Sequence, residues 1–185
     1  MAKRLCPWWM GYFLVCPMRR WLQKPEALLA PYLREGMTVL EPGPGMGFFT
    51  LPMSRMAGPA GKIVAVDIQA KMLEYLRRRA MKASTLDRID MRLAQPDSLG
   101  IGDLNDRVDF VLAFFMVHEM PSPAEFFREA AAAMKAGTFM LFAEPAGHVK
   151  PEKFQAELQV ARDAGLEVTA RPAISRSMAA VLRKA

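Results

Sequence analysis

An acidic residue followed by three alternate glycines is the first feature of this sequence whose residue types and spacing suit chemistry. Residues 37–49 read MTVLEPGPGMGFF, so an apolar run ends at Glu41 before the glycines, which are Gly43, Gly45 and Gly47. Glycine has no Cβ, so it adopts positive φ angles and lets the backbone approach a bound molecule closely. We therefore expect a buried strand to end here beside a ligand, with a helix following over residues 48–56. A side chain at Gly45 should intrude on that ligand.

Two ligand classes fit a glycine-rich turn between a strand and a helix. A dinucleotide fingerprint is G-x-G-x-x-G, but its third glycine would fall on Phe48. Pro44 also removes an N–H donor that a phosphate group would need. The pattern present, acidic-x-G-x-G-x-G, resembles the first signature of the class I S-adenosylmethionine-dependent methyltransferases. That resemblance implies that the glycines pack against the methionine part of the cofactor and that Glu41 helps to orient its amino group.

A second acidic residue stands at the end of the next expected strand. Residues 62–66 read KIVAV, a mostly β-branched and apolar run, and Asp67 follows it, 24 residues after Gly43, as expected for one βαβ unit. A carboxylate in this place can accept hydrogen bonds from both hydroxyls of a ribose. Nicotinamide enzymes place an acid similarly, so Asp67 favours a methyltransferase only together with the alternate glycines. The structural alternative is that Asp67 caps the following helix.

The resemblance also implies contacts with the adenine ring in the loop after a third strand, residues 89–94. Gln95, Asp97 and Ser98 are the nearest candidates there, and the alternative is a surface turn in which Asp97 acts locally. The complete set of expected cofactor contacts is Glu41, Pro42, Gly43, Pro44, Gly45, Gly47, Asp67, Ile68, Met72, Gln95, Asp97, Ser98, Phe114 and Phe115.

The exit of a fourth strand, residues 108–114, carries the candidate catalytic residue. His118 is one of two histidines in the chain, and Glu119 follows it directly. Ligands of open α/β sheets lie outside the carboxyl ends of the strands, where a neutral imidazole can take a proton from a nucleophile. The alternatives are a structural histidine and a reaction without a base, because the sulfonium already makes the methyl group electrophilic. The expected substrate contacts are Trp8, Trp9, Tyr12, Glu119 and Glu144.

The N-terminal segment is the least regular part of the sequence. Residues 5–18 are apolar, are flanked by basic pairs and are interrupted by Pro7 and Pro17. The run has no small-residue cleavage site, so we predict a cytoplasmic protein rather than an exported one. An apolar segment of this kind must pack on something. We interpret residues 1–35 as a helical cap whose first 20 residues form a lid over the acceptor, with lipid or another subunit as the alternative.

The remaining patterns predict one α/β domain over residues 36–185. Helices are expected over residues 24–33, 70–83, 122–135 and 151–164, with a capping box from Ser122 to Glu125. A fifth strand is expected over residues 138–143, after a turn at Ala136 and Gly137, and a closing hairpin over residues 168–173 and 177–183. By resemblance this is a seven-stranded, mostly parallel, doubly wound Rossmann-like sheet with helices on both faces.

Composition limits the function classes. The net charge of +6 is concentrated at the two ends of the chain, and two cysteines cannot form a disulfide framework. Neither a metal-ligand spacing nor a phosphate loop nor a serine-elbow pattern is present, so no metal is expected. We expect a small-molecule acceptor and no nucleic acid, with weak peripheral membrane contact and a homodimer left open. The alternatives are a nicotinamide oxidoreductase, for which no second domain remains, and a non-catalytic cofactor-binding or interaction protein.

Overall fold

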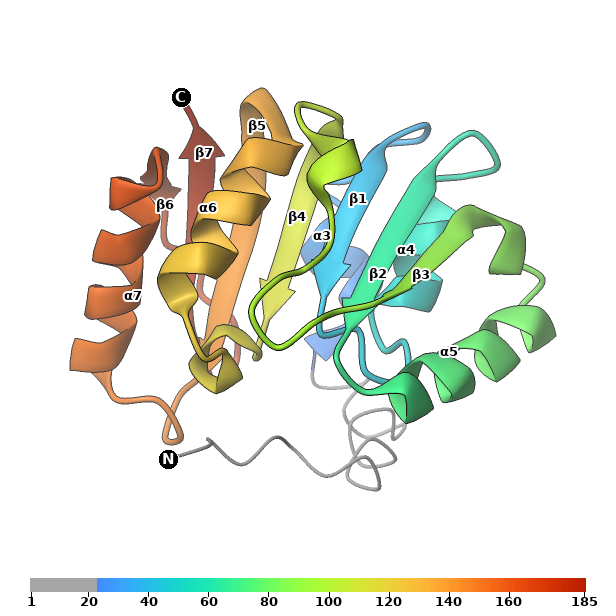
Figure 1. The fold of residues 1–185 in the computed structure, drawn as a ribbon, viewed down its shortest axis with the longest axis horizontal. Coiled ribbons are helices and arrows are strands. Elements are labelled where there is room, and N and C mark those ends of the chain that lie inside the picture. Colours follow the sequence, from blue (N-terminus) through green and yellow to red (C-terminus); the bar gives the residue numbers. More distant parts are fainter. Residues whose placement is uncertain (1–22) are drawn as a thin grey trace. The chain divides into compact units, whose positions relative to one another are not determined.

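The computed structural model describes residues 23–185 (Figure 1). The predictions made for residues 1–22, including the lid and the contacts of Trp8, Trp9 and Tyr12, lie outside the described residues and stay predictions. The strands form one seven-stranded sheet in the order β3-β2-β1-β4-β5-β7-β6, which confirms the predicted fold class. Internal contacts divide the described residues into two compact parts, 23–94 and 95–185, which are taken in turn below.

The first part alternates helices and parallel strands. Its elements are α3 (Pro25–Leu29), β1 (Thr38–Pro42), α4 (Thr50–Met56), β2 (Lys62–Asp67), α5 (Ala70–Lys82), the 3₁₀ turn η2 (Leu86–Arg88) and β3 (Ile89–Leu93). Strand β2 pairs in parallel with β1 on one side and with β3 on the other. The carboxyl ends of parallel strands lie at one edge of a sheet, so Glu41, Asp67 and Leu93 come from that same edge.

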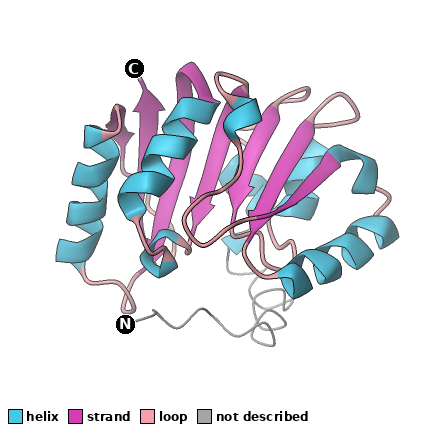
Figure 2. Ribbon diagram, viewed as in Figure 1, coloured by secondary structure: helices cyan, strands magenta, loops and turns pink. Residues whose placement is uncertain are grey.

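The second part combines a parallel pair of strands with an antiparallel hairpin (Figure 2). Its elements are η3 (Gly102–Leu104), β4 (Val108–Phe114), η4 (Val117–Glu119), α6 (Pro123–Ala133), β5 (Met134–Pro145), α7 (Pro151–Asp163), β6 (Leu166–Ala170) and β7 (Ser177–Lys184). Strand β4 runs parallel to β5, whereas β7 runs antiparallel to both β5 and β6. The antiparallel hairpin predicted for the C-terminal end is therefore confirmed. Helices α6 and α7 pack against each other.

Three buried phenylalanines fix strand β5 against these two helices. The Phe142 ring lies 5.5 Å from Phe127 of α6, edge-on, and is stacked 5.2 Å from Phe154 of α7. All three side chains are at most 2% exposed. Side chains two residues apart lie on the same face of a strand, so Glu144 extends toward the same layer as Phe142. The aromatic core thus directs a buried carboxylate toward α7.

Two predicted boundaries of α6 and β5 are wrong. The helix ends at Ala133, and the strand begins at Met134, four residues earlier than expected. Met134 is fully buried and pairs with Val108, after which the pairing shifts so that Phe110 faces Phe139. The sequence of residues 134–137 is typical of a helix end, but pairing with β4 draws it into an irregular strand, in which Gly137 takes a φ of 75°.

The other boundary corrections are smaller. The helix expected over residues 24–33 is the short α3, and the helix expected from residue 48 begins at Thr50. The closing strand expected over residues 168–173 covers Leu166–Ala170. Ser122 caps α6 as predicted, since its Oγ accepts a hydrogen bond from the Glu125 N–H at 3.2 Å, but the Glu125 carboxylate accepts from Arg128 Nε instead of closing the box. Among the described residues, no helix is long and apolar enough to cross a membrane.

Candidate active site

Glu41 is a buried acid at the carboxyl end of β1. Its side chain is 4% exposed, and its Oε2 accepts a hydrogen bond of 2.5 Å from the Thr50 hydroxyl at the start of α4. Burial raises the pKa of Glu41 to about 8; the Thr50 hydrogen bond opposes this rise, and the nearby charge of Asp67 adds to it. A cationic group brought beside this carboxyl would favour its charged form. The amino group of an amino acid is such a cation, and the assignment of Glu41 to the methionine end of the cofactor stays a prediction.

The raised pKa of Glu41 predicts that the ligand-free protein loses stability as the pH rises. Unfolding returns the carboxyl to an ordinary value near 4.5, so the folded protein holds an extra proton between about pH 4.5 and about pH 8. The free energy of unfolding should therefore fall across this range, by on the order of 2 kcal/mol between about pH 6 and about pH 8. Glu41→Gln has no such proton to lose, and its stability should exceed that of the parent increasingly as pH rises. Urea unfolding of both proteins across this range measures the difference, and parallel curves would contradict the assignment.

The three glycines all take left-handed backbone angles, but the surroundings of Gly45 and Gly47 differ. Their φ values are 68° at Gly43, 54° at Gly45 and 85° at Gly47. A Cβ added to Gly47 would lie 2.5 Å from Leu76 Cδ1 in α5, so this glycine permits close packing of a helix. A Cβ added to Gly45 would meet no atom of the described residues within 4 Å. None of the described residues therefore fills the space beside Gly45, and its contact with a ligand stays a prediction.

Asp67 holds the glycine loop from the end of β2. Its Oδ2 accepts from the Gly45 N–H at 3.2 Å, and its Oδ1 accepts from the Gln69 N–H at 2.8 Å. Gln69, not Asp67, stands at the N-cap position of α5, so Asp67 is not the cap of that helix. A carboxylate oxygen can accept more than one hydrogen bond, so these two contacts do not by themselves exclude hydroxyl donors. The loop is fastened further by Arg79 of α5, whose guanidinium donates to the Met46 carbonyl.

Two exposed apolar side chains accompany Asp67 at this edge of the sheet. Ile68 is 36% exposed, and Leu93, which stands opposite Asp67 in the ladder between β2 and β3, is 60% exposed. Leu93 was not among the residues predicted from the sequence. Met72, by contrast, is 3% exposed and belongs to the buried side of α5.

In the second part of the chain, residues 95–98 form a tight turn that is fastened to α6. The Gln95 N–H donates to the Ser98 carbonyl at 2.9 Å, and Glu129 Oε2 accepts from Ser98 Oγ at 3.3 Å and from the Leu99 N–H at 2.9 Å. Asp97 is exposed at the tip of this turn. The assignment of Gln95, Asp97 and Ser98 to the adenine ring stays a prediction.

The chain turns sharply where it leaves β4. Phe115 has a φ of 63°, a conformation uncommon for a bulky residue, and its N–H donates to the Ala143 carbonyl of β5 at 2.8 Å. The Phe114 and Phe115 rings lie 4.3 Å apart at an angle of 37°. Backbone strain of this kind clusters at functional sites, where surrounding contacts hold it in place. The turn directs the chain into η4, which carries His118.

His118 and Glu144 make a bidentate contact between η4 and the end of β5. The His118 N–H donates to Glu144 Oε1 at 2.9 Å, and His118 Nδ1 lies 2.5 Å from Glu144 Oε2. Glu144 is fully buried, and the His118 side chain is 9% exposed. The other ring nitrogen, Nε2, lies 3.8 Å from Glu119 Oε1, beyond hydrogen-bond distance. The expected base and two expected substrate residues are thus brought together, with Glu144 bonded to His118.

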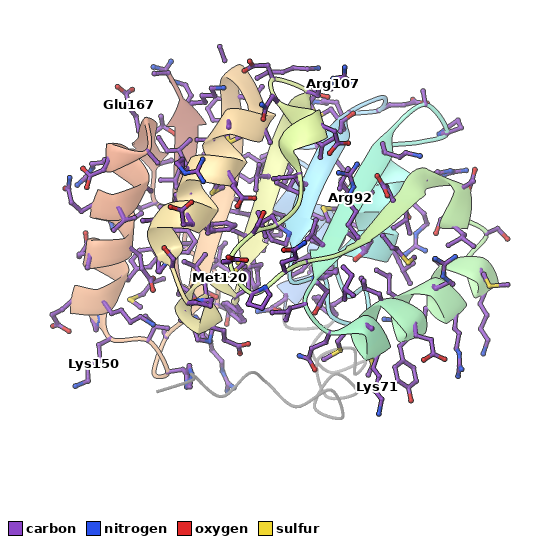
Figure 3. The ribbon with its side chains drawn as sticks, in the orientation of Figure 1. Lys71, Arg92, Arg107, Met120, Lys150 and Glu167 are labelled. Carbon is purple, nitrogen blue, oxygen red and sulfur yellow. The ribbon has the colours of Figure 1, made fainter. Side chains whose placement is uncertain are left out.

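Three more charged or titratable residues complete this cluster. The His148 ring, on the loop after β5, meets the His118 ring edge-on at 5.0 Å. Lys153 of α7 donates to the His118 carbonyl at 3.3 Å and lies 3.5 Å from Glu157 Oε1. Figure 3 labels two residues that mark the segments involved, Met120 after η4 and Lys150 before α7. Sequence reasoning missed these three because nothing local indicates that residues 148–157 fold back onto residue 118.

Comparison with known proteins identifies the family. A family model described as a methyltransferase domain matches residues 14–180. The chain belongs to this methyltransferase family. A solved S-adenosylmethionine-dependent methyltransferase from Aquifex aeolicus is 25% identical, with a TM-score of 0.84 over 97% of this chain and 98% of that one. S-adenosylmethionine is accordingly the methyl donor of this methyltransferase domain, as its glycine loop predicts, and the nicotinamide oxidoreductase alternative is set aside.

Curated relatives match a shorter part of the chain. A ubiquinone/menaquinone biosynthesis C-methyltransferase from Hahella chejuensis is 30% identical over 112 residues, which cover 60% of this chain and 44% of that protein. A ubiquinone biosynthesis O-methyltransferase from Paramagnetospirillum magneticum is 29% identical over 114 residues, covering 62% and 42%. The match therefore spans less than half the length of these relatives. The [4+2]-cyclase SpnF shares the fold, with a TM-score of 0.71 at 16% identity.

Proposed function

We propose that this methyltransferase domain transfers the methyl group of S-adenosylmethionine to a small molecule whose nucleophile is a hydroxyl or another weakly acidic group. The observation that carries this proposal is the bidentate contact of His118 with Glu144 at the exit of β4. A histidine held in this way can accept a proton from an acceptor at the moment when its nucleophile attacks. His118 is the proposed catalytic residue, and orientation of the two reactants supplies much of the remaining rate.

The first part of the chain is the proposed holder of the methionine and ribose ends of the cofactor. Glu41 supplies a carboxyl for the amino group, none of the described residues fills the space beside Gly45, and Asp67 supplies a carboxylate at the end of β2 for the ribose hydroxyls. When bound, S-adenosylmethionine supplies an electrophilic methyl group. The assignments of Pro42, Gly43, Pro44, Ile68 and Met72, and of Phe114 and Phe115 in the second part, remain expectations from the family resemblance.

Two observations support a small acceptor. Several of the curated relatives are named for quinone biosynthesis. One of them is named as a C-methyltransferase and another as an O-methyltransferase. The polar groups around His118 are mainly acids, namely Glu119, Glu144 and Glu157. Acids repel phosphate groups, so this cluster suits a neutral or cationic acceptor better than a nucleic-acid backbone. A tRNA methyltransferase from Methanocaldococcus jannaschii also matches, at 24% identity over 108 residues, so tRNA belongs in the test as a comparison.

The test is a screen for methyl transfer, followed by a variant of the base. Formation of S-adenosylhomocysteine is measured with phenols, reduced quinones, amines and tRNA as acceptors. We expect transfer to a phenol or reduced quinone and none to tRNA. With the best acceptor, His118→Gln should lower kcat by about 10²–10⁴-fold without weakening S-adenosylhomocysteine binding. His148→Gln, the matched control at the neighbouring ring, should lower kcat far less. Transfer to tRNA alone, or an unchanged kcat in His118→Gln, would contradict the proposal.

A further inference from the structure

Glu144 is placed to control His118 rather than to touch the acceptor. Its carboxylate is fully buried, and both of its oxygens contact His118, one through the backbone N–H and one through Nδ1. Strand β5 is paired on both sides at this position, since Glu144 lies opposite Met178 of β7 and the preceding residue, Ala143, lies opposite Phe114 of β4. The carboxylate therefore lies on a strand that is held on both sides. From the sequence, Glu144 was instead predicted to contact the substrate.

The contact pattern selects one protonation form of the pair. The His118 N–H is a donor at all pH values, so the carboxylate accepts at Oε1. An ionised carboxylate is an acceptor at both oxygens, and it is best satisfied at Oε2 by a proton carried on Nδ1. A neutral imidazole with its proton on Nδ1 has its lone pair on Nε2.

Among the described residues, Glu119 is the other acid within 4 Å of the His118 ring. Its Oε1 lies 3.8 Å from Nε2, whereas Glu144 Oε2 lies 2.5 Å from Nδ1. A distance of 3.8 Å is too long for a hydrogen bond, so Glu119 stabilises a proton on Nε2 only weakly. The distances therefore favour the Nδ1–H form.

Helix α7 supports the same arrangement from the other side. Lys153 Nζ donates to the His118 carbonyl, so η4 is held at its backbone N–H, its carbonyl and its ring. Glu157, one turn further along α7, is 4% exposed, and its carboxylate accepts no hydrogen bond from the described residues, although Lys153 Nζ lies 3.5 Å from Oε1. Burial raises the pKa of Glu157, as does the charge of Glu144, while Lys153 and His118 oppose the rise. Glu144, rather than Glu157, is therefore the acid in hydrogen-bond contact with the ring.

We propose that Glu144 is a positioning residue, which holds His118 in the Nδ1–H tautomer and so leaves Nε2 as the atom that takes the acceptor's proton. The catalytic half of this statement rests on the proposed function, but the tautomer does not. During transfer the acceptor's proton would move to Nε2 as its nucleophile bonds to the methyl carbon and the carbon–sulfur bond breaks, giving S-adenosylhomocysteine and an imidazolium stabilised by the Glu144 carboxylate.

The tautomer is measured by nitrogen NMR of protein labelled with ¹⁵N-histidine. The chain has two histidines, so His148→Gln assigns both sets of resonances. At a pH where the ring is neutral, the parent protein should show a protonated Nδ1 and an unprotonated Nε2 on His118. Glu144→Gln should shift the population toward the Nε2–H form. Glu119→Gln makes the same chemical change beside the other ring nitrogen and should leave the Nδ1–H form in place.

Each outcome of the tautomer measurement either supports or overturns the proposal. An Nε2–H form in the parent protein would overturn it without any variant, which matters if Glu144→Gln fails to fold by circular dichroism. An unchanged tautomer in a folded Glu144→Gln protein would also overturn it. With an acceptor in hand, Glu144→Gln should lower kcat on the order of 10²-fold or more with little change in KM. A shifted tautomer with an unchanged kcat would support the positioning role and refute His118 as the base, so the two proposals fail separately.

Discussion

Asp67→Ala is expected to weaken the binding of S-adenosylhomocysteine by about 2–4 kcal/mol, because it removes a charged acceptor from both ribose hydroxyls. The carboxylate also accepts from the Gly45 and Gln69 N–H groups, so its loss loosens the loop that faces the cofactor. Isothermal titration calorimetry of the parent and the variant measures the change. Parent-like affinity in the variant would show that Asp67 does not hold the ribose.

Asp67→Asn removes the charge of this carboxylate while keeping one of its two acceptor oxygens. Each oxygen of Asp67 accepts from a different backbone N–H, so in the variant either the Gly45 or the Gln69 N–H would face the amide NH2 group. We expect both its affinity for S-adenosylhomocysteine and its thermal stability to lie between those of the parent and the alanine variant. If both variants lose stability without ligand as strongly as they lose affinity, Asp67 acts mainly through the loop.

Gly47→Ala is expected to lower the free energy of unfolding by about 2–4 kcal/mol. The new methyl group would lie 2.5 Å from Leu76 Cδ1, a side chain that is fully buried, and overpacking of this kind costs about 1–3 kcal/mol. A φ of 85° adds strain for any residue with a Cβ, about 1 kcal/mol more. Urea unfolding measures the loss, and parent-like stability would contradict the close packing of α5 on the loop.

Gly45→Ala is the matched control for this loss. It is the same substitution two residues away, with a φ of 54° and no atom of the described residues within 4 Å of the new methyl group. It should cost only about 1 kcal/mol of stability yet weaken cofactor binding. Shortening the opposing side chain with Leu76→Val should recover part of the stability of Gly47→Ala, a coupling that a double-mutant cycle detects.

Local patterns in the sequence predicted most of the fold. The apolar runs before Glu41 and Asp67 are short, β-branched and bounded by turn residues, so their strands were identified to within about one residue. The start of β5 was missed because a Lys-Ala-Gly run has the local chemistry of a helix end, and only its pairing with Val108 makes it a strand. Local propensity therefore predicts an element's boundary correctly only where no tertiary contact, such as the pairing of Met134 with Val108, overrides it.

The two groups of candidate residues differed in how far they could be predicted from the sequence. The Glu41 and Asp67 positions follow from one βαβ unit, so spacing along the chain was sufficient. The His118 cluster depends on contacts across 26 residues to Glu144 and 35 residues to Lys153, which no local pattern encodes. His118 was therefore identified as a candidate base, whereas the role of Glu144 and the presence of Lys153 required the structure.

Calorimetric titration with S-adenosylhomocysteine tests most directly whether this chain works as an S-adenosylmethionine-dependent methyltransferase domain. We expect S-adenosylhomocysteine and S-adenosylmethionine to bind one molecule per chain, Asp67→Ala and Gly45→Ala to weaken that binding, and NAD not to bind under the same conditions. Binding of NAD in place of S-adenosylhomocysteine, or parent-like affinity in both variants, would contradict the assignment of the glycine loop and Asp67 to this cofactor.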